Sequence, residues 1–273
     1  MYRRAGRSSW LSPLHFSPKL AFVLLVWGVL PGYGAESPVY GVFFGTHYLQ
    51  SGSTLMPHPA GSAGWECWVR NVPAGEVTET TVWTPGGEDM TCYPGTQGAY
   101  LGIALPSTTY RDMVFPPGIY QIEEVLADEE LRTTALTLTA GTAPAAPTVL
   151  NATQWTQWPA GQALPVSWQA GAGTLATDTF VVSLEGLSGF PRHFETPMPG
   201  QSGALNGTAS SYTIPAQYLT TNGTYYVRLS CCCAQGTDGK LTGQYSATLL
   251  MLVVTGAGLQ DVAAYHFATG RVF

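Results

Sequence analysis

The chain has 273 residues, of which only 10% are charged, and its formal net charge at pH 7 is −6. A nucleic acid or an anionic membrane requires a basic surface, so the composition argues against both as partners. Its 32 glycines and 20 prolines alternate with short apolar runs, and long amphipathic helical patterns are absent. This distribution predicts an all-β protein.

The N-terminal segment is typical of a secretory signal peptide. Basic residues precede an apolar run of eleven residues, Leu20–Leu30, about half of what a membrane-spanning helix needs. The small residues Gly32 and Gly34 then suit cleavage before Ala35. We expect residues 1–34 to be removed and the mature protein to be secreted without a transmembrane anchor, to the extracellular space, the cell surface or the periplasm. An uncleaved anchor is the alternative, and it would also leave the remaining residues outside the membrane.

Residues 37–141 predict a first β-sandwich domain. In Thr133–Ala140 apolar and threonine side chains alternate with a period of two, as a strand with one buried face requires. Val77–Thr84 alternates less cleanly, so its assignment depends on β-branched residues and on the turn that follows. This number of strands in about 105 residues suits a two-sheet sandwich. The predicted strands are Val39–Leu49, Trp65–Val72, Val77–Thr84, Ala99–Leu105, Ile119–Leu126 and Thr133–Ala140.

Residues 142–147 contain only small residues and two prolines, and they predict a short interdomain linker. A second domain is expected over residues 148–256. Its predicted strands are Thr148–Trp155, Leu164–Ala170, Asp178–Gly186, Ser210–Ala216, Thr224–Ala234 and Tyr245–Gly256. We expect the C-terminal tail, residues 257–273, to be a loose terminal strand or a stub that packs on the second domain.

The second domain carries residues that resemble a known family. Trp168 ends an alternating strand, and Leu219 lies six residues before Tyr225. This pattern resembles the fibronectin type III domain, in which a tryptophan of strand B fills the core and a tyrosine begins strand F. The resemblance covers residues 147–256 and implies that Trp168, Leu219 and Tyr225 lie in the core, with the tyrosine hydroxyl bonded to the backbone at the sandwich corner. The proline that usually precedes this tyrosine is replaced by Thr220–Gly223.

A weak internal repeat supports a two-domain organisation. Residues 116–141 and 221–256 share a turn glycine, a tyrosine two residues later, a hairpin and a closing strand that contains threonine. The second hairpin is about ten residues longer than the first. The repeat predicts two tandem immunoglobulin-like or fibronectin type III-like sandwiches after the signal peptide. Chance similarity between β-rich sequences is the alternative.

Three of the five cysteines, Cys231, Cys232 and Cys233, are consecutive. Alternation along a strand places Cys231 and Cys233 on one face and Cys232 on the other. Same-face neighbours are roughly 7 Å apart, which is too far for a disulfide, and a triplet inside one strand cannot converge on a metal ion. We expect buried or partly exposed free thiols, or a local disulfide, without function. Because the cysteine total is odd, an intermolecular bridge through one of the three is the alternative, and metal or redox chemistry is the third reading.

Cys67 and Cys92 predict an intradomain disulfide. Each lies in or beside a strand of the first domain, with no other cysteine nearby, in a chain expected to enter an oxidising compartment. A bridge across a loop of this length stabilises a protein by about 3 kcal/mol. Two buried thiols are the alternative.

The remaining sequence shows no pattern typical of catalysis. The histidines are scattered, and no metal-binding, nucleophile or nucleotide-binding spacing occurs. The acidic segment Glu123–Arg132 fits no calcium loop and is expected to be a solvated hairpin. We therefore expect no catalytic residue, no metal site and no cofactor.

Aromatic residues give the remaining indication of function. Trp155 and Trp158 are three residues apart and fall on opposite faces of a regular strand. We expect one of them in the core, while the other either packs between the domains or forms an exposed platform for a sugar.

The sequence predicts a non-catalytic extracellular binding or adhesion module for a glycan or a surface protein. Domains of this type resemble accessory modules of extracellular bacterial proteins, so a bacterial source is expected. The alternative is a structural subunit that forms oligomers through edge strands or an intermolecular disulfide. An enzyme of unknown chemistry is the third hypothesis. An exposed aromatic patch would favour glycan binding, long uncapped edge strands would favour assembly, and two acids that converge with a histidine would indicate an enzyme.

Overall fold

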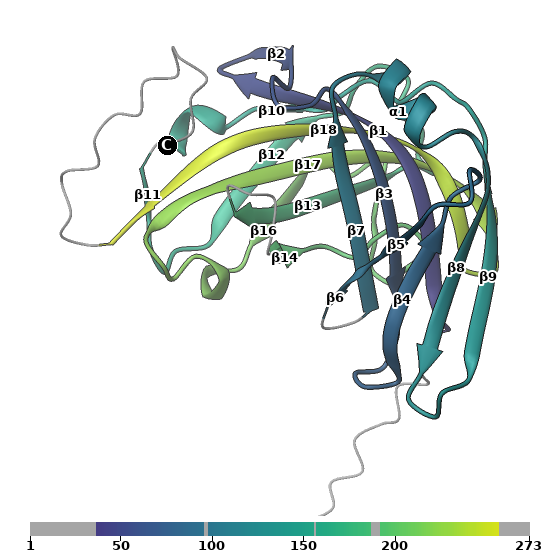
Figure 1. Ribbon diagram of the computed structural model, residues 1–273. Helices are drawn as coiled ribbons and strands as arrows, with labels where there is room; N and C mark the ends of the chain where they lie inside the picture. The colour runs from purple at the N-terminus through teal and green to yellow at the C-terminus, as the bar shows by residue number, and fades with distance from the viewer. Residues whose placement is uncertain (1–36, 96–97, 156, 187–191, 257–273) are drawn as a thin grey trace, which may run out of the picture. The chain divides into compact units, whose positions relative to one another are not determined.

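The fold is all-β, with short helical turns in the connections (Figure 1). The computed structural model describes residues 37–95, 98–155, 157–186 and 192–256. These residues belong to a single unit, Ala35–Phe273. The expected signal peptide and the C-terminal tail lie outside the described residues.

A large sheet, which we call the shared sheet, contains strands from both halves of the chain. Neighbouring strands along it are antiparallel except for β1 and β18, which are parallel. Its order is β14 (Arg192–Glu195), β13 (Thr179–Gly186), β17 (Gly223–Thr237), β18 (Lys240–Thr255), β1 (Val39–Ser51), β3 (Ala63–Arg70), β7 (Gly98–Leu105) and β6 (Tyr93–Gly95). Shorter strands add to it: β2 (Thr54–Pro57) beside β1, β15 (Leu205–Asn206) beside β13, and β11 (Trp158–Pro159) beside β18.

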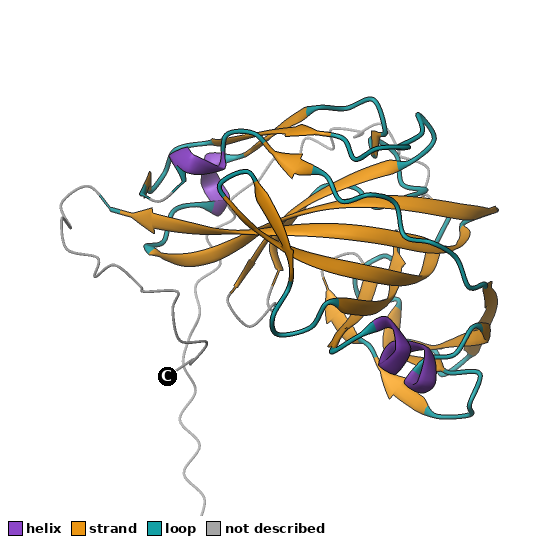
Figure 2. Ribbon diagram, turned by 90° about the horizontal axis from the view of Figure 1, so that it is seen from above, coloured by secondary structure: helices purple, strands orange, loops and turns teal. Residues whose placement is uncertain are grey.

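Two smaller sheets accompany the shared sheet, one in each half of the chain. The first contains β5 (Asp89–Thr91), β4 (Val77–Trp83), β8 (Gly118–Leu126) and β9 (Leu131–Leu138). The second contains β10 (Thr148–Val149), β12 (Leu164–Gln169) and β16 (Ser211–Ile214). The connections include helix α1 (Thr108–Val114) and the 3-10 turns η1 (Ala152–Gln154) and η2 (Ala216–Tyr218) (Figure 2). In the described part of the chain, no helix has the length and apolar character needed to cross a bilayer.

The strand predictions for the first half are confirmed, because β1, β3, β4, β7, β8 and β9 match the expected segments within two residues at each end. The prediction for Thr148–Trp155 is wrong beyond Val149, where η1 replaces the strand. The reason is local. The side-chain amide of Asn151 bonds to β12, donating to the Pro165 carbonyl at 2.7 Å and accepting from the Ser167 amide at 3.1 Å. The side chain of Asn151 therefore makes hydrogen bonds to β12 that the backbone of a continued strand would otherwise make.

Helix α1 was not predicted from the sequence. Its N-cap is Ser107, whose hydroxyl accepts from the Tyr110 amide at 3.2 Å. The buried guanidinium of Arg111 lies 4.2 Å from the ring centre of Phe44 and donates to the Gly45 carbonyl at 3.3 Å. These contacts attach a helix of two turns to β1, and so short a helix leaves too little periodicity to detect.

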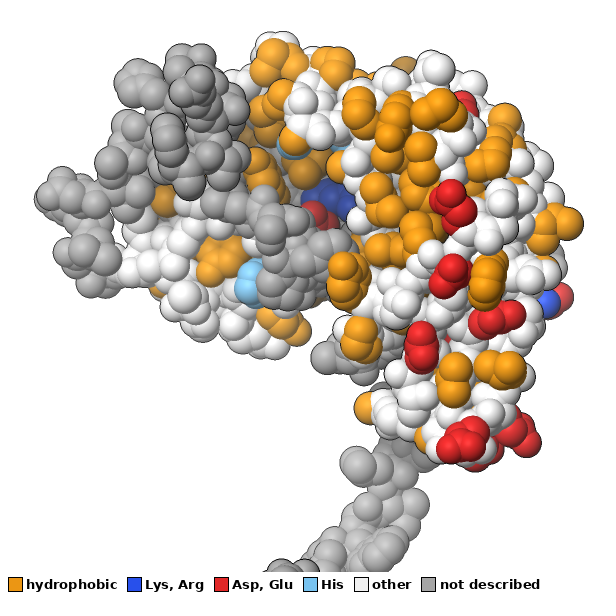
Figure 3. Space-filling view, in the orientation of Figure 1, with side chains coloured by type: hydrophobic (Ala, Val, Ile, Leu, Met, Phe, Trp, Pro, Cys, Tyr) orange, Lys and Arg blue, Asp and Glu red, His pale blue; other side chains and the backbone are white. Residues whose placement is uncertain are grey.

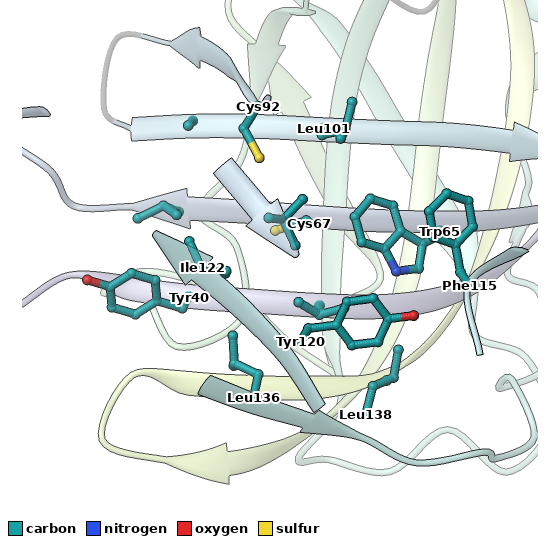
Figure 4. Close-up of a cluster of buried hydrophobic side chains, with 14 of the residues drawn as sticks. Tyr40, Trp65, Cys67, Cys92, Leu101, Phe115, Tyr120, Ile122, Leu136 and Leu138 are labelled. Atoms are coloured by element: carbon teal, nitrogen blue, oxygen red, sulfur yellow. The ribbon is translucent and has the colours of Figure 1, made fainter. Parts of the chain in front are cut away.

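Both hydrophobic cores lie on one face of the shared sheet. In the first core Trp65 stacks on Phe115 with ring centres 4.6 Å apart (Figure 4), and in the second Trp168 packs on Phe180 at 5.3 Å. Phe44 of the first core pairs with Gln244 of β18, so these two side chains lie on the same face of the sheet. Leu250 of the second core is an even number of residues from Gln244 on β18 and therefore lies on that face as well. Each core is covered by the small sheet of its own half. The covering residues include Ile122, Leu136, Val166 and Ile214.

The internal repeat has a structural counterpart in two tyrosines. The hydroxyl of Tyr225 donates to the carbonyl of Thr221 at 3.0 Å. The hydroxyl of Tyr120 donates to the carbonyl of Pro116 at 2.9 Å, with the same spacing of four residues. Both rings are buried in their cores. Each half therefore contains a tyrosine that satisfies a corner carbonyl, as immunoglobulin-type sandwiches do.

The longer hairpin of the second half joins the two halves. Its far end, Lys240–Leu249 of β18, pairs in parallel with Tyr40–Leu49 of β1. The second hairpin is longer than the first, and its additional residues are among those that pair with β1. The cysteine triplet lies on β17, opposite these residues of β18. The expectation of two separate sandwiches in tandem is replaced by two cores on one continuous sheet.

The predicted linker is bound to the shared sheet and is not a free spacer. Alternate side chains of β18 donate to carbonyl oxygens in and beside it: Gln244 to Thr139, Ser246 to Pro144 and Thr248 to Pro147. On β1 the buried amide of Gln50 donates to the Val149 carbonyl at 2.7 Å and accepts from the Val149 amide at 2.9 Å. These bonds satisfy backbone groups that the small sheets leave unpaired.

The turn between β17 and β18 provides a test of the junction with β1. Asp238 and Gly239 have φ values of 54° and 72°, as a two-residue hairpin turn requires. A Cβ on Gly239 would lie 2.7 Å from the Pro38 carbonyl oxygen, next to β1. We expect Gly239→Ala to lower the free energy of unfolding by more than the roughly 1–2 kcal/mol of positive-φ strain alone. Urea denaturation measures this loss.

Gly52→Ala is the matched control, because Gly52 has a φ of 59° and no atom within 4 Å of an added Cβ. Gly52→Ala should lower the free energy of unfolding only by the strain of the positive φ. Equal losses in the two variants would mean that the contact with Pro38 does not constrain the turn.

Candidate functional site

The face of the shared sheet opposite the two cores carries a cluster of aromatic and charged side chains. Alternation assigns to this face Glu185 of β13, Tyr226 and Arg228 of β17, Tyr245 of β18, His47 of β1 and Glu66 of β3. The ring of Tyr245 lies against Gly45, where an added Cβ would be 2.0 Å from it, and the tyrosine hydroxyl lies against Gly64, where an added Cβ would be 2.3 Å from the oxygen. Glycine at these positions lets the ring rest on the backbone of two neighbouring strands.

Arg228 is the centre of a buried ion cluster on this face. Its guanidinium pairs with Glu66 and lies 3.6 Å from Glu185, and these three residues are only 7%, 6% and 5% exposed. Strands β18 and β1 lie between β17 and β3, which puts those two strands roughly 14 Å apart in a flat sheet, and the register offsets Arg228 from Glu66 further along the strands. The direct pair fits a sheet that bends toward this face, as Figure 1 shows. We call it the concave face.

Tyr245 and His47 extend the cluster with two uncharged groups. The tyrosine oxygen and the Nε2 atom of His47 are 2.9 Å apart, and the Arg228 guanidinium lies 5.1 Å from the tyrosine ring centre. Burial lowers the pKa of His47 to about 3, and the charge of Arg228 acts in the same direction. Burial, assisted by the charge of Glu66, raises the pKa of Tyr245. Both groups are therefore neutral at physiological pH and share one hydrogen bond.

Partly exposed rings border the ion cluster. The ring centres of Tyr226 and His58 are 6.4 Å apart in an edge-to-face arrangement, and Tyr226 pairs with Met251 across the hairpin. Tyr226, His58 and His47 are each partly exposed. Figure 3 shows a hollow on this side of the molecule in which basic and acidic side chains lie beside hydrophobic ones. Apolar walls with a few fixed polar groups are typical of ligand sites.

The end of β14 and the segment after it cover another part of the concave face. Glu195 forms an ion pair with Arg70 at 2.8 Å, and the side-chain amide of Gln201 donates to that of Asn71 at 2.6 Å. Met198 is buried in a third hydrophobic cluster, which lies on the concave face. The other buried members of this cluster are Val39, Phe43, Trp68, Tyr100, Val181, Cys232, Leu241, Tyr245 and Ala247. The rings under this segment are closed to ligands, so the accessible part of the concave face is the part bordered by Tyr226.

The cysteine triplet follows the predicted alternation, because Cys231 is buried in the second core and Cys232 in the cluster on the concave face. Burial raises the pKa of Cys231 to about 11. Burial and the neighbouring Asp178 raise the pKa of Cys233 to about 12. Protonated buried thiols are poor nucleophiles. An intermolecular bridge at Cys231 or Cys232 would require the sheet to open, and only Cys233 of the three is partly exposed.

Cys67 and Cys92 lie together in the first core as thiols. The sulfur of Cys92 points toward Cys67 (Figure 4), and the two thiols are in hydrogen-bond contact. Burial raises the pKa of Cys67, and the hydrogen bond with Cys92 adds to the effect. The structure contains no disulfide between them, so the predicted bridge stays a prediction.

The tryptophans predicted as a sugar platform are not on the concave face. Trp155 is the one of the two that lies in the core, where it is fully buried and unavailable to a ligand. Trp158 of β11 is partly buried against the same core, and its Nε1 donates to the Gln162 carbonyl at 3.2 Å. Trp168, Leu219 and Tyr225 all lie in that core, as the resemblance implied.

The acidic hairpin is also less solvated than expected, because Glu124 is 1% exposed and paired with Arg132 at 2.8 Å. Among the described residues, no group of three or more histidine, cysteine, aspartate or glutamate side chains could hold a metal ion.

Sequence reasoning missed the concave face because its members lie on separate strands. Glu66 and Arg228 are 162 positions apart. The signal that was present is a charge inside an apolar strand, since Arg228 stands among alternating core residues of β17. Such a charge requires a buried partner, but the sequence does not say which acid supplies it.

Comparison with known proteins adds little to this description. No protein-family model and no curated protein matches the sequence. Similar solved structures include the fibronectin(III)-like modules of Clostridium thermocellum CbhA, with 9% identity, a TM-score of 0.25 and coverage of 83% of this chain and 100% of that one. Murine CEACAM1b shows 8% identity, a TM-score of 0.23 and coverage of 81% and 100%. At these values the likeness extends no further than the all-β class.

The neutral state of His47 predicts a pH dependence of stability. Its pKa is about 3 in the folded protein against 6.5 when unperturbed. Between these values the unfolded state binds more protons, so the stability falls as the pH falls. We expect this residue to contribute a loss of about 1.4 kcal/mol per pH unit between about pH 6 and pH 4. Urea denaturation of the wild type and of His47→Gln measures the difference in slope.

The exposed His193 provides the control. His193→Gln should keep the wild-type slope, whereas His47→Gln should flatten it. Identical slopes for His47→Gln and the wild type would show that His47 titrates normally in the folded protein.

We predict a Cys67–Cys92 bridge when the protein folds in an oxidising compartment, since both side chains lie in the first core and the sulfur of Cys92 points toward Cys67. We expect peptide mapping without reduction to find these two residues linked, and the buried Cys231 and Cys232 to be alkylated only after unfolding. Reduction should then lower the stability by about 3 kcal/mol. Recovery of alkylated Cys67 and Cys92 from unfolded, unreduced protein would contradict the bridge, and a linked dimer through Cys233 would support assembly.

Proposed function

We propose that this protein is a non-catalytic extracellular binding module, and that its ligand, a glycan or a surface protein, binds the accessible part of the concave face. The observation that supports this is the group of partly exposed rings, Tyr226, His58 and His47, beside a buried ion cluster. A glycan is the leading class. The apolar faces of aromatic rings suit the CH groups of sugars, and polar groups at the edge suit their hydroxyls.

The ion cluster gives such a site rigidity. Arg228 is held by Glu66 and by the Ser230 hydroxyl, which accepts from its Nε atom at 3.1 Å. Glu185 accepts in turn from the Ser183 hydroxyl at 2.9 Å. Buried charges with these partners keep a single arrangement, so a ligand would meet fixed groups and would lose little entropy in ordering them.

Assembly through edge strands is the alternative function, and the described edges offer it little length. Strands β14 and β6 at the ends of the shared sheet have four and three residues, and β6 contains Pro94. The longer edge strand β9 is partly capped, because the Thr242 hydroxyl donates to the Thr137 carbonyl at 3.1 Å. Short or capped edges are the usual protection against pairing with other chains.

An enzyme is the third candidate, because Glu66, Glu185 and His47 surround Arg228 and so bring two acids and a histidine together. Their state does not suit acid–base catalysis. Both carboxylates are ion-paired with the same guanidinium, and a histidine with a pKa of about 3 is a weak base.

The proposed site is tested by removing a ring at its border. We expect the purified secreted protein to bind a subset of ligands on a glycan array, and Tyr226→Ala to weaken that binding at least tenfold, equivalent to about 1.4 kcal/mol. Titration calorimetry with the best array ligand measures the affinity.

Tyr110→Ala is the matched control, because Tyr110 is 44% exposed on helix α1. It should bind like the wild type. Equal affinity of Tyr226→Ala and the wild type would place the ligand elsewhere. If the array shows no binding, crosslinking to intact cells through a photoreactive residue at position 226 tests a surface protein as the ligand.

A further inference from the structure

The floor of the accessible part of the concave face is aliphatic. Leu49 of β1 pairs with Leu249 of β18 on one side and with Met56 of β2 on the other, so these side chains form a row across three strands. Met251 continues the floor along β18 and lies opposite Tyr226 of β17. Met56 is 45% exposed, and the other three aliphatic side chains are partly exposed. A ligand on this face therefore meets methyl and methylene groups before it meets the buried ion cluster.

Two rings approach this floor from opposite sides. Tyr226 is on β17 and His58 directly follows β2, so β18 and β1 lie between the two residues in the sheet. Their ring centres are nevertheless only 6.4 Å apart, which requires both side chains to lie over the floor. The rings and the aliphatic side chains thus form one continuous surface on which a small apolar group can pack.

His58 supplies an uncharged hydrogen-bond donor at the border of the floor. Its Nδ1 atom accepts from the Ala60 amide at 3.3 Å. Burial lowers the pKa of the ring, so the imidazole is neutral at physiological pH. A neutral imidazole carries one proton, and because Nδ1 is an acceptor, that proton lies on Nε2. The Nε2 atom therefore offers an N–H group to an acceptor on the ligand.

An acidic sugar does not suit this surface. Among the side chains that the structure describes there, the only positive charge is that of Arg228, and Glu66 and Glu185 already share it. These three residues are buried, so a ligand carboxylate would lose hydration without gaining a positive partner among them. The described groups favour an uncharged glycan over an acidic one.

An unsubstituted hexose makes poor use of the same floor. Its hydroxyls would lose water against Leu249 and Met251, whose side chains offer no strong hydrogen bonds in return. A sugar that carries a methyl group at its rim would bury that group there instead. An acetamido group combines a methyl group with a carbonyl acceptor, and Nε2 of His58 is the donor that the carbonyl requires.

We propose that the ligand is an uncharged glycan with N-acetylated sugars, and that an acetamido group binds beside Tyr226. Its methyl group packs against Leu249 and Met251, and its carbonyl oxygen accepts from Nε2 of His58. This inference rests on the proposed function, because it names the class of glycan that the same site takes.

The test compares N-acetylglucosamine and N-acetylgalactosamine with glucose and galactose, which carry a hydroxyl in place of the acetamido group. NMR titration of the full secreted protein should show saturable changes in the amide signals of Leu249 and Met251 with the acetylated sugars. We expect an acetylated sugar to bind about tenfold more tightly than its parent hexose, because it gains a buried methyl group and a hydrogen bond. Glucosamine, which carries an ammonium group at the same position, should bind no better than glucose.

Two variants assign the preference to particular side chains. Met251→Thr replaces part of the aliphatic floor with a polar group, and His58→Phe keeps a ring but removes the donor. Each should lower the ratio of the affinity for the acetylated sugar to that for its parent, whereas Tyr226→Ala should weaken both. Met113→Thr is the matched control and should keep the wild-type ratio, since Met113 is 69% exposed on helix α1.

Equal affinity for acetylated and parent sugars would overturn this inference, as would tighter binding of glucosamine or an absence of signal changes with both acetylated sugars. An unchanged ratio in both variants would contradict the assigned contacts. If the variants fail to fold, the comparison of sugars on the wild type still decides the matter. Binding to array glycans that lack N-acetyl groups would keep the proposed function and overturn only this inference. The absence of any glycan binding would contradict this inference and the leading ligand class of the proposed function together.

Discussion

The parallel pairing of β1 with β18 is the constraint on which the rest of the structure depends. Each of these two strands gives alternate residues to a core on one face and to the concave face on the other. The Arg228–Glu66 ion pair crosses both strands, so it exists only while they are paired. The bonds that fix residues 139–149 also originate from these strands. One ladder therefore organises two cores, a polar cluster and a connection.

The features that the sequence predicted are those determined by local pattern. Strands such as β9 and β12 are readable because one buried face imposes a period of two on neighbouring residues. Trp168 and Tyr225 were placed in a core by the resemblance of their spacing to the fibronectin type III domain, and both rings are buried. Even the buried Trp155 was anticipated in part, since one of two opposed tryptophans was expected inside.

The features that could not be predicted depend on partners distant in sequence. Parallel pairing of the first and last described strands leaves no trace in either strand alone, because both simply read as long and apolar. Glu124 looked like a member of a solvated acidic hairpin, and its burial follows from Tyr40 and Arg132 on other strands. A charge in a strand reveals that a partner must exist, whereas only the tertiary fold identifies it.

The register between β1 and β18 also determines the order in which the chain can fold. Thr46 and Ser246 bond to each other across 200 positions, so the ladder closes a very large loop. The hairpins β8–β9 and β17–β18 close much shorter loops and should form earlier. During synthesis from the N-terminus, the edge of β1 that pairs with β18 stays unpaired until nearly the whole sequence has been made. Unpaired edges recruit other chains, so the period before β18 arrives is when this protein is most exposed to misassembly.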